Sequence, residues 1–126
     1  MKEIITTSKA AAPIGPYNQA VKFGNTLYTS GQIAIDSSTG NLVQSDIKAE
    51  TKQCMENLKA ILDEAGFSFE DVVKTSIFIA DMHQFAQINE VYGGYFNNQT
   101  APARETVEVA NLPKFVNVEI SMIAMK

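Results

Sequence analysis

The first part of the chain alternates hydrophobic and polar residues over short runs, which is typical of β-strands. The segment KEIIT, residues 2–6, predicts one strand. The segment AVKFGNTLYTSGQIAID, residues 20–36, predicts a β-hairpin, because Gly24 and Asn25 form a dipeptide that favours a tight turn between strands. The segment SSTGN, residues 37–41, predicts a loop after the hairpin.

A different period begins at Asp46 and predicts a helix over residues 46–66. Asp46 can cap its N-terminus with a side-chain oxygen, and Gly66 can end it in the left-handed conformation that glycine adopts freely. Apolar and small residues recur at steps of three and four along one stripe: Ile47, Thr51, Cys54, Leu58, Ile61, Leu62 and Ala65. This face of the helix is expected to pack on a core.

The next segment predicts a strand followed by a second helix. DVVKTSIFIA, residues 71–80, is β-branched and apolar on both alternating faces, which favours a strand with a neighbour on each side. Asp81, with Gln84 three residues later, resembles a capping box and predicts the start of the helix. Its stripe is Phe85, Ile88, Val91, Tyr92 and either Tyr95 or Phe96.

Two more strands are predicted near the end of the chain, over residues 104–110 and 116–125. The order β, β, β, α, β, α, β, β contains no internal repeat and no linker. It predicts a single α+β domain over residues 1–126, with two helices on one face of a mixed sheet. The strands around Val72, Ile77, Val109 and Val118 are too apolar for an uncovered second face, which predicts a homo-oligomer.

Composition and charge narrow the possible functions. The formal net charge is −4, whereas a general nucleic-acid binder gathers positive charge, so we expect no nucleic-acid partner. We find no apolar run long enough for a transmembrane helix and no apolar core of a secretory signal near the start. The sequence therefore predicts a soluble, cytoplasmic protein without a membrane partner.

The chain has one cysteine and one histidine, and their positions limit the chemistry. A disulfide framework and a zinc site built from Cys and His are both excluded. Cys54 lies in the middle of the first helix stripe, which favours a buried and unreactive thiol over a nucleophile. His83 falls outside the second helix stripe among polar neighbours, which favours an exposed surface residue.

Three features could carry chemistry: Arg104, Glu119 and the segment TSG at residues 29–31. Arg104 opens a strand, where its planar guanidinium could bind a carboxylate or phosphate through two hydrogen bonds; an ion pair with an acid at the strand end is the alternative. Glu119 lies within an otherwise apolar strand, and a side chain pointing into water is the alternative there. Gly31 permits close approach to the backbone, so nearby N–H groups could hold an anion or a water molecule.

Several motifs, in this order and spacing, resemble the RidA/YjgF family over essentially the whole chain. They are IGPYNQAV, LYTSGQIAID, TKQCMENLKAILDEAG, INEVYGGYF, APARETVEV and NLPKFVNVEI. The resemblance implies a chorismate mutase-like α+β fold and homotrimers with ligand sites in the clefts between subunits. It also implies hydrolysis of reactive enamines and imines, such as 2-aminoacrylate and 2-iminobutanoate, to 2-keto acids and ammonia, without metal or cofactor.

The resemblance also implies roles for individual residues. Arg104 matches the arginine that binds the substrate carboxylate, and Glu119 matches the acid beside the attacking water. Further matches line the pocket or lie on the second helix: Tyr17, Ser30, Gly31 and Asn89.

The chain departs from the family pattern beside the arginine. Thr106 stands where many members have a cysteine, so a mechanism that needs a thiol there is excluded, although the backbone at Thr106 can still contact the ligand. Glu105 stands where a serine is common, and its negative charge is expected to weaken anion binding at Arg104.

Two other functions remain open on the sequence alone. The protein could bind a small carboxylate metabolite as a regulatory module without turning it over. It could also be an endoribonuclease, an activity assigned to some relatives, although metal-free RNA cleavage needs paired acid and base groups and a cationic surface.

Overall fold

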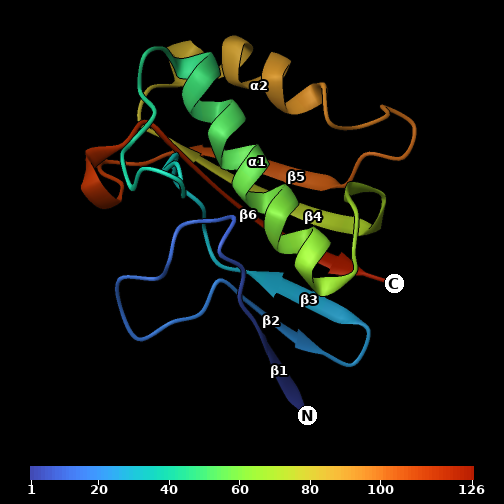
Figure 1. Ribbon diagram of the computed structural model, residues 1–126. Helices are drawn as coiled ribbons and strands as arrows, with labels where there is room; N and C mark the ends of the chain where they lie inside the picture. The colour runs from blue at the N-terminus through green and yellow to red at the C-terminus, as the bar shows by residue number, and fades with distance from the viewer.

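The polypeptide forms six strands and two α-helices in the predicted order, and the computed structural model describes all residues from 1 to 126 (Figure 1). The strands are β1 (Lys2–Ile5), β2 (Ala20–Phe23), β3 (Thr26–Thr29), β4 (Val72–Ile79), β5 (Ala103–Glu108) and β6 (Val118–Met125). The helices are α1 (Ile47–Ala65) and α2 (Phe85–Gly93), and three short 3-10 turns cover Phe69–Asp71, Met82–Gln84 and Pro113–Phe115. The predicted α+β architecture is confirmed.

The strands form one mixed sheet in the order β1-β2-β3-β6-β4-β5. All neighbouring pairs are antiparallel except β4 and β5, which are parallel. A parallel pair needs a crossover, and α2 supplies it between these two strands. β4 pairs with a strand on each side, as predicted, whereas β5 lies at an edge of the sheet.

The predicted hairpin forms, but its second strand is shorter than expected. Gly24 adopts a left-handed conformation (φ 63°) in the turn between β2 and β3, which its missing side chain permits. β3 ends at Thr29, and residues 30–36 make only isolated bridges, including one between Gln32 and Ile120. The amide of Asn57 on α1 donates hydrogen bonds to two carbonyl groups of this segment, which holds it away from a continuous ladder.

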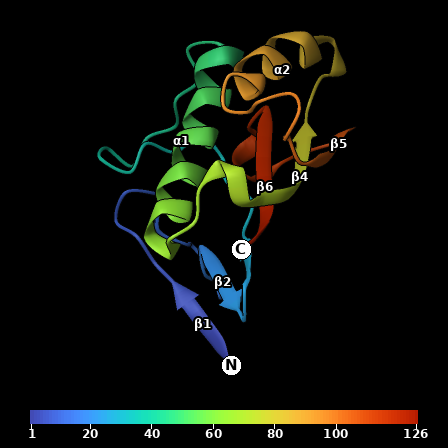
Figure 2. The ribbon, with the colours of Figure 1, turned by 90° about the vertical axis from the view of Figure 1, so that its right-hand side faces the viewer.

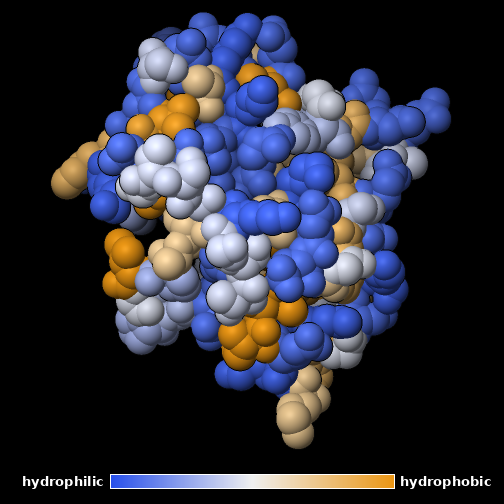
Figure 3. Space-filling view, in the orientation of Figure 1, coloured by the Kyte–Doolittle hydropathy of each residue, from blue (hydrophilic) through white to orange (hydrophobic).

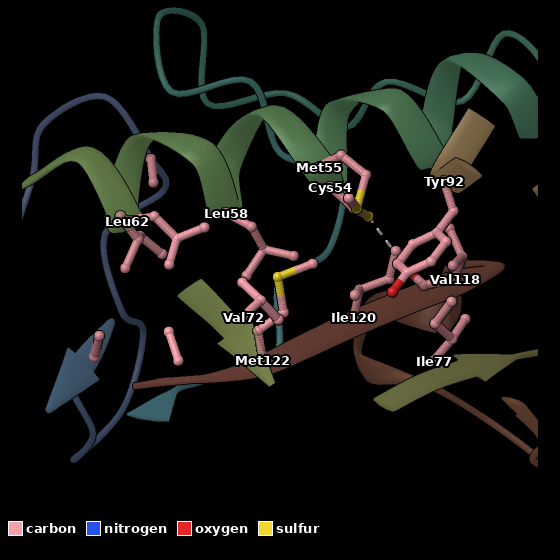
Figure 4. Close-up of a cluster of buried hydrophobic side chains, with 14 of the residues drawn as sticks. Cys54, Met55, Leu58, Leu62, Val72, Ile77, Tyr92, Val118, Ile120 and Met122 are labelled. Carbon is pink, nitrogen blue, oxygen red and sulfur yellow. Dashed lines mark hydrogen bonds between the residues drawn. The ribbon is translucent and has the colours of Figure 1, made fainter. Parts of the chain in front are cut away.

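The helix α1 begins, ends and packs as the sequence predicts. Asp46 accepts a hydrogen bond from the N–H of Ala49 (2.8 Å), and Gly66 ends the helix with a φ of 79°. Its predicted stripe faces the core, and Cys54 and Leu58 are completely buried there (Figure 4). Burial raises the pKa of the Cys54 thiol, in agreement with an unreactive side chain.

The start of α2 differs from the prediction. Asp81 does not form a capping box with Gln84; its carboxylate accepts a hydrogen bond from the N–H of His83 (2.9 Å) and caps the 3-10 turn Met82–Gln84 instead. α2 then begins at Phe85. The cause is local competition, because an aspartate can bond to the backbone two residues ahead in a tighter turn. His83 itself is exposed, as predicted, and its ring contacts Asp81 (2.9 Å).

Both helices cover the same face of the sheet, and the core lies between these layers (Figure 2). Every second side chain of β6 points toward α1, and these include Val118, Ile120 and Met122 (Figure 4). The outer surface of the helices is mostly hydrophilic (Figure 3). Neither helix combines the length and apolar character that a membrane span requires.

The prediction of an apolar second face named four strand regions, and the structure shows which residues of the sheet lie on that face. Val72, Ile77 and Val118 belong to the core beneath the helices, and Val109 lies beyond the end of β5. Alternation along each strand places a different apolar set on the uncovered face: Ile4, Val21, Tyr28, Phe78, Val107 and Ile123. That face therefore has apolar side chains of its own, which lie beside polar ones such as Glu119 and Ser121.

Candidate functional site

Glu119 on β6 lies directly against Gly31. It projects from the sheet face opposite Val118 and Ile120, because successive residues of a strand point to opposite sides. A Cβ atom added to Gly31 would lie 2.0 Å from Oε2 of Glu119, so only glycine leaves room for this carboxylate. The side chain is half-buried, and burial raises the pKa of its carboxyl group. The alternative of a side chain pointing freely into water is wrong.

A cleft of about 340 Å³ opens beside this pair. Its walls are the loop around Ala11–Ile14, the segment after β3, and Pro113 from the turn before β6. Four of the residues that the resemblance implicates line it: Tyr17, Ser30, Gly31 and Glu119. The cleft thus combines one half-buried carboxylate with a largely apolar lining.

Hydrogen bonds fix the walls of the cleft. Ser30 donates from its hydroxyl to the carbonyl of Asn18 (2.5 Å) and from its backbone to the carbonyl of Gln19 (2.8 Å). These bonds hold the chain next to Tyr17 against the end of β3, so Ser30 shapes the wall of the cleft. The N–H of Gly31, in contrast, donates to no acceptor within the chain and is available to a ligand or a water molecule.

Arg104, the only arginine of the chain, lies outside this cleft, between β5 and α2. Its Nη1 donates to Oδ1 of Asn89 (2.7 Å), and its guanidinium lies 5.6 Å from the ring centre of Phe85 and 5.0 Å from that of Tyr92. It forms no salt bridge with any carboxylate of the chain. The alternative of an ion pair at the strand end is therefore wrong, and the charge is oriented without being neutralised.

The two aromatic residues beside Arg104 were not among the predicted site residues. Phe85, Asn89 and Tyr92 follow one another at helical spacing and so share one face of α2. Tyr92 is anchored in turn, because its hydroxyl donates to Oγ1 of Thr75 (3.0 Å). The sequence already indicated this arrangement, because Phe85 and Tyr92 lie four residues before and three residues after Asn89, on the same side of α2.

The two residues after Arg104 point in opposite directions. Glu105 lies on the other face of the sheet, where it pairs with Lys74 (2.9 Å) and accepts a hydrogen bond from the hydroxyl of Ser76. These contacts lower the pKa of Glu105, with the Ser76 bond as the larger cause. The expectation that Glu105 weakens anion binding assumed a charge beside Arg104, whereas the structure places that charge on the opposite face and pairs it with Lys74. Thr106 shares the face of Arg104, and its Oγ1 is buried without a hydrogen-bond partner.

One chain does not bring all the expected site residues together. Arg104 is aligned with Thr75 of β4 on the helix side of the sheet, whereas Glu119 is aligned with Phe78 on the open side. The cleft therefore lacks Arg104, Asn89 and Thr106. No group of three or more His, Cys, Asp or Glu side chains is arranged to hold a metal ion.

The arrangement defines a small α+β protein with an oriented, unpaired arginine on one side of the sheet and a carboxylate cleft on the other. A family model described as Endoribonuclease L-PSP matches residues 7–126. The chain belongs to this family, which is the RidA/YjgF family predicted from its motifs.

Individual relatives are similar over nearly their whole length. A RutC family protein of Pyrococcus horikoshii is 53% identical, with 100% of this chain and 99% of the relative covered. The 2-iminobutanoate/2-iminopropanoate deaminase of Salmonella typhimurium is 46% identical, with 100% and 99% covered.

Solved structures agree with the fold. A Rid family protein of Yersinia pestis superposes with a TM-score of 0.96 at 45% identity and covers 100% of both chains. TdcF of E. coli, solved with bound serine, gives a TM-score of 0.92 at 43% identity and covers 98% of both chains.

Proposed function

We propose that this protein hydrolyses reactive enamines and imines, such as 2-aminoacrylate and 2-iminobutanoate, to 2-keto acids and ammonia without a cofactor. The observation that carries the proposal is the guanidinium of Arg104, which is fixed by Asn89 and two aromatic rings but lacks an anionic partner. Such a group suits the carboxylate of a small 2-imino acid. The Salmonella typhimurium relative named as a deaminase of this kind supports the choice of substrate.

We further propose that the complete site forms between two copies of the chain, within a homotrimer. The edge strand β5 of one copy would bring Arg104 and Thr106 to the cleft of the next copy, which contains Glu119 and Gly31. Two observations support this arrangement: the separation of these groups within one chain, and the exposed apolar side chains on the uncovered face of the sheet, among them Ile4, Tyr28 and Val107. A trimer of this kind uses one head-to-tail contact repeated around a ring.

In the proposed mechanism, Arg104 binds the substrate carboxylate and places the imine carbon beside a water molecule held by Glu119. The backbone of Thr106 and the free N–H of Gly31 complete the polar surroundings of the ligand. An enamine substrate first tautomerises to the imine, as its β-carbon takes a proton from water and its nitrogen releases one to water. Glu119 then accepts a proton from the water as its oxygen bonds to the imine carbon.

The same carboxyl group completes the reaction by returning that proton to the nitrogen. This gives a carbinolamine, whose hydroxyl proton passes to the same nitrogen through the Glu119 carboxylate as the carbon–nitrogen bond breaks. Ammonia then leaves and the carbonyl of the 2-keto acid forms, so that water and imine are the only reactants. Because such imines also hydrolyse in water, positioning of the two reactants is expected to supply most of the acceleration.

Glu119 gives the reaction a characteristic dependence on pH. Its carboxylate form accepts the proton, and burial raises its pKa, so kcat/KM should fall as the pH drops through a value above that of an ordinary glutamate. Glu119→Gln should abolish this acid limb and lower kcat by about ten- to hundredfold, while 2-oxobutanoate still binds. Rates measured against pH, with the buffer rate subtracted at each point, would test this. An acid limb that persists in Glu119→Gln would assign the base to another group.

The test of the proposed function is the release of 2-keto acid from 2-iminobutanoate that a threonine dehydratase generates in the same solution. The wild-type protein should accelerate release above the rate in buffer, and Arg104→Ala should remove the acceleration. A folded wild-type protein that leaves the rate unchanged would contradict the proposal.

A second candidate function is binding of a small carboxylate metabolite without turnover. The unpaired Arg104 favours it equally, and the E. coli TdcF structure contains bound serine. Binding of 2-oxobutanoate that depends on Arg104, together with keto acid release at the buffer rate, would select this function.

The structure gives less support to RNA cleavage, the activity in the description of the family model. The net charge is −4, and the side chain of the only histidine, His83, is 97% exposed and lies beside Asp81, outside the cleft. RNA cleavage that persists unchanged in Arg104→Ala would point to a contaminating nuclease.

A further inference from the structure

A buried carboxylate outside the cleft is connected to the strand that carries Glu119. Glu50, in the first turn of α1, is only 1% exposed. No Lys, Arg or His side chain forms a salt bridge with it. Burying an ionisable group is costly unless its oxygens accept hydrogen bonds, so its contacts indicate why the site contains a glutamate.

All hydrogen bonds of the Glu50 carboxylate come from the chain just before Glu119. Oε2 accepts from the backbone N–H groups of Asn117 (2.8 Å) and Val118 (3.3 Å), and Oε1 accepts from the side-chain amide of Asn117 (2.9 Å). One turn later on α1, Sγ of Cys54 lies 3.8 Å from the carbonyl oxygen of Val118 (Figure 4). Side chains of α1 therefore contact both the backbone N–H and the carbonyl oxygen of Val118, the residue before Glu119.

The segment that enters this contact is strained. Lys114 and Phe115 both have left-handed backbones, with φ of 56° and 53°, although neither is a glycine. Such conformations persist only where the surrounding structure fixes them, and the Glu50 contacts begin two residues after this pair. The turn also places Pro113 in the wall of the cleft, so both ends of the segment touch the candidate site.

We propose that Glu50 is a positioning residue for Glu119. By binding the N–H groups of Asn117 and Val118, it fixes the point at which β6 enters the sheet and thereby the place of the Glu119 carboxylate against Gly31. The effect on turnover rests on the proposed imine hydrolysis. The effect on Glu119 itself does not depend on that activity.

Two replacements of Glu50 separate its hydrogen bonds from its bulk. Glu50→Gln keeps one oxygen for both backbone N–H groups, and a rotated amide of Asn117 can accept from the new NH₂ group. Glu50→Leu has a similar volume but accepts no hydrogen bond. We expect the leucine variant to lose about tenfold or more in kcat with KM within about twofold, since Arg104 is untouched, and the glutamine variant to retain most of kcat.

Thr51→Val is the matched control. Thr51 is the next residue of α1 and is also fully buried, but its hydroxyl donates to the carbonyl of Ile47 within the helix (2.8 Å). This variant should keep the wild-type kcat. An equal loss of kcat in Thr51→Val and Glu50→Leu would show a general effect of perturbing α1 and would overturn the proposal.

A second readout follows Glu119 directly. The carbon NMR signal of its carboxyl group, followed against pH, should show an elevated pKa in the wild type and in Glu50→Gln, and a shift toward the ordinary glutamate value in Glu50→Leu as water reaches the displaced side chain. An unchanged titration in a folded leucine variant would overturn the proposal, whether or not the wild type hydrolyses imines. A wild-type protein without activity would instead overturn only the proposed function.

If the leucine variant fails to fold, Glu50→Asp can replace it for both readouts. Its shorter carboxylate withdraws from the two N–H groups, so the expected changes have the same direction.

Discussion

Replacing Arg104 with lysine should lower kcat/KM for 2-iminobutanoate by about ten- to hundredfold, nearly as much as replacing it with alanine. Lysine keeps the positive charge but cannot offer the planar pair of N–H groups that binds both oxygens of a carboxylate. It also loses the geometry in which the guanidinium bonds to Asn89 and lies over Phe85 and Tyr92. The measurement is the initial rate of keto acid release over a range of imine concentrations.

Lys48→Ala provides the control for the Arg104 prediction. Lys48 is an exposed cation on α1 that pairs with Glu90 of α2 (2.7 Å), and exposed pairs of this kind contribute little to stability. Its loss should leave kcat/KM unchanged. An Arg104→Lys variant with nearly normal kcat/KM would contradict a two-point contact with the substrate, because charge alone would then be sufficient.

Replacing Gly31 with alanine should abolish most of the turnover while the protein remains folded. The new Cβ would occupy the space of Oε2, Cδ and Cγ of Glu119, at 2.0, 2.7 and 2.9 Å. The glutamate side chain can rotate away, so the cost to folding is modest, but the carboxylate leaves its place in the cleft. A displacement of this size should lower kcat by about tenfold or more.

Gly93→Ala is the matched glycine control. Apart from its two chain neighbours and the nearby backbone of α2, no atom lies within 4 Å of a Cβ added at Gly93, which is at the end of α2. Its φ is not positive. This variant should keep full activity. Wild-type kcat in Gly31→Ala, with the variant shown to be folded by its thermal unfolding, would remove the Glu119 carboxylate from the mechanism.

The parts of the fold that could be predicted depend on local chemistry. Asp46 and Gly66 bound α1 as expected, because a cap and a left-handed glycine act within one turn of the helix. The predicted capping box of Asp81 and Gln84 does not form, and the reason is also local. The aspartate side chain can cap either an α-helix or a tighter 3-10 turn, and here it caps the 3-10 turn. Sequence alone did not decide between them.

The parts that could not be predicted depend on how strands align. Alternation shows which residues of a strand share a face but not which face the helices cover. The strands around Val72, Ile77 and Val118 could therefore be predicted to be apolar, but not which of their residues line the uncovered face. The compensation of Glu105 by Lys74 depends on the parallel register of β4 and β5, which no short motif specifies. Predictions for single side chains were more reliable than predictions for their partners.

The candidate site shows the same division. Arg104, Gly31 and Glu119 could be selected from residue type and family resemblance, and each lies in surroundings suited to its proposed role. The sequence could not show that these residues lie on two different faces of the sheet, because that follows from the register of β4, β5 and β6. This distribution makes a second copy of the chain necessary in our account.

Mixing two impaired variants tests most directly whether the site is shared between two copies of the chain. Arg104→Ala chains retain the cleft with Glu119, and Glu119→Gln chains retain the arginine, so mixed trimers should contain some sites with both groups. After the two variants are unfolded and refolded together in equal amounts, random assembly around a ring predicts about a quarter of the wild-type keto acid release. Each variant refolded alone should release keto acid at no more than about a tenth of the wild-type rate. A mixture that stays as inactive as its components, although mass measurement shows mixed trimers, would contradict a site shared between Arg104 of one copy and Glu119 of another.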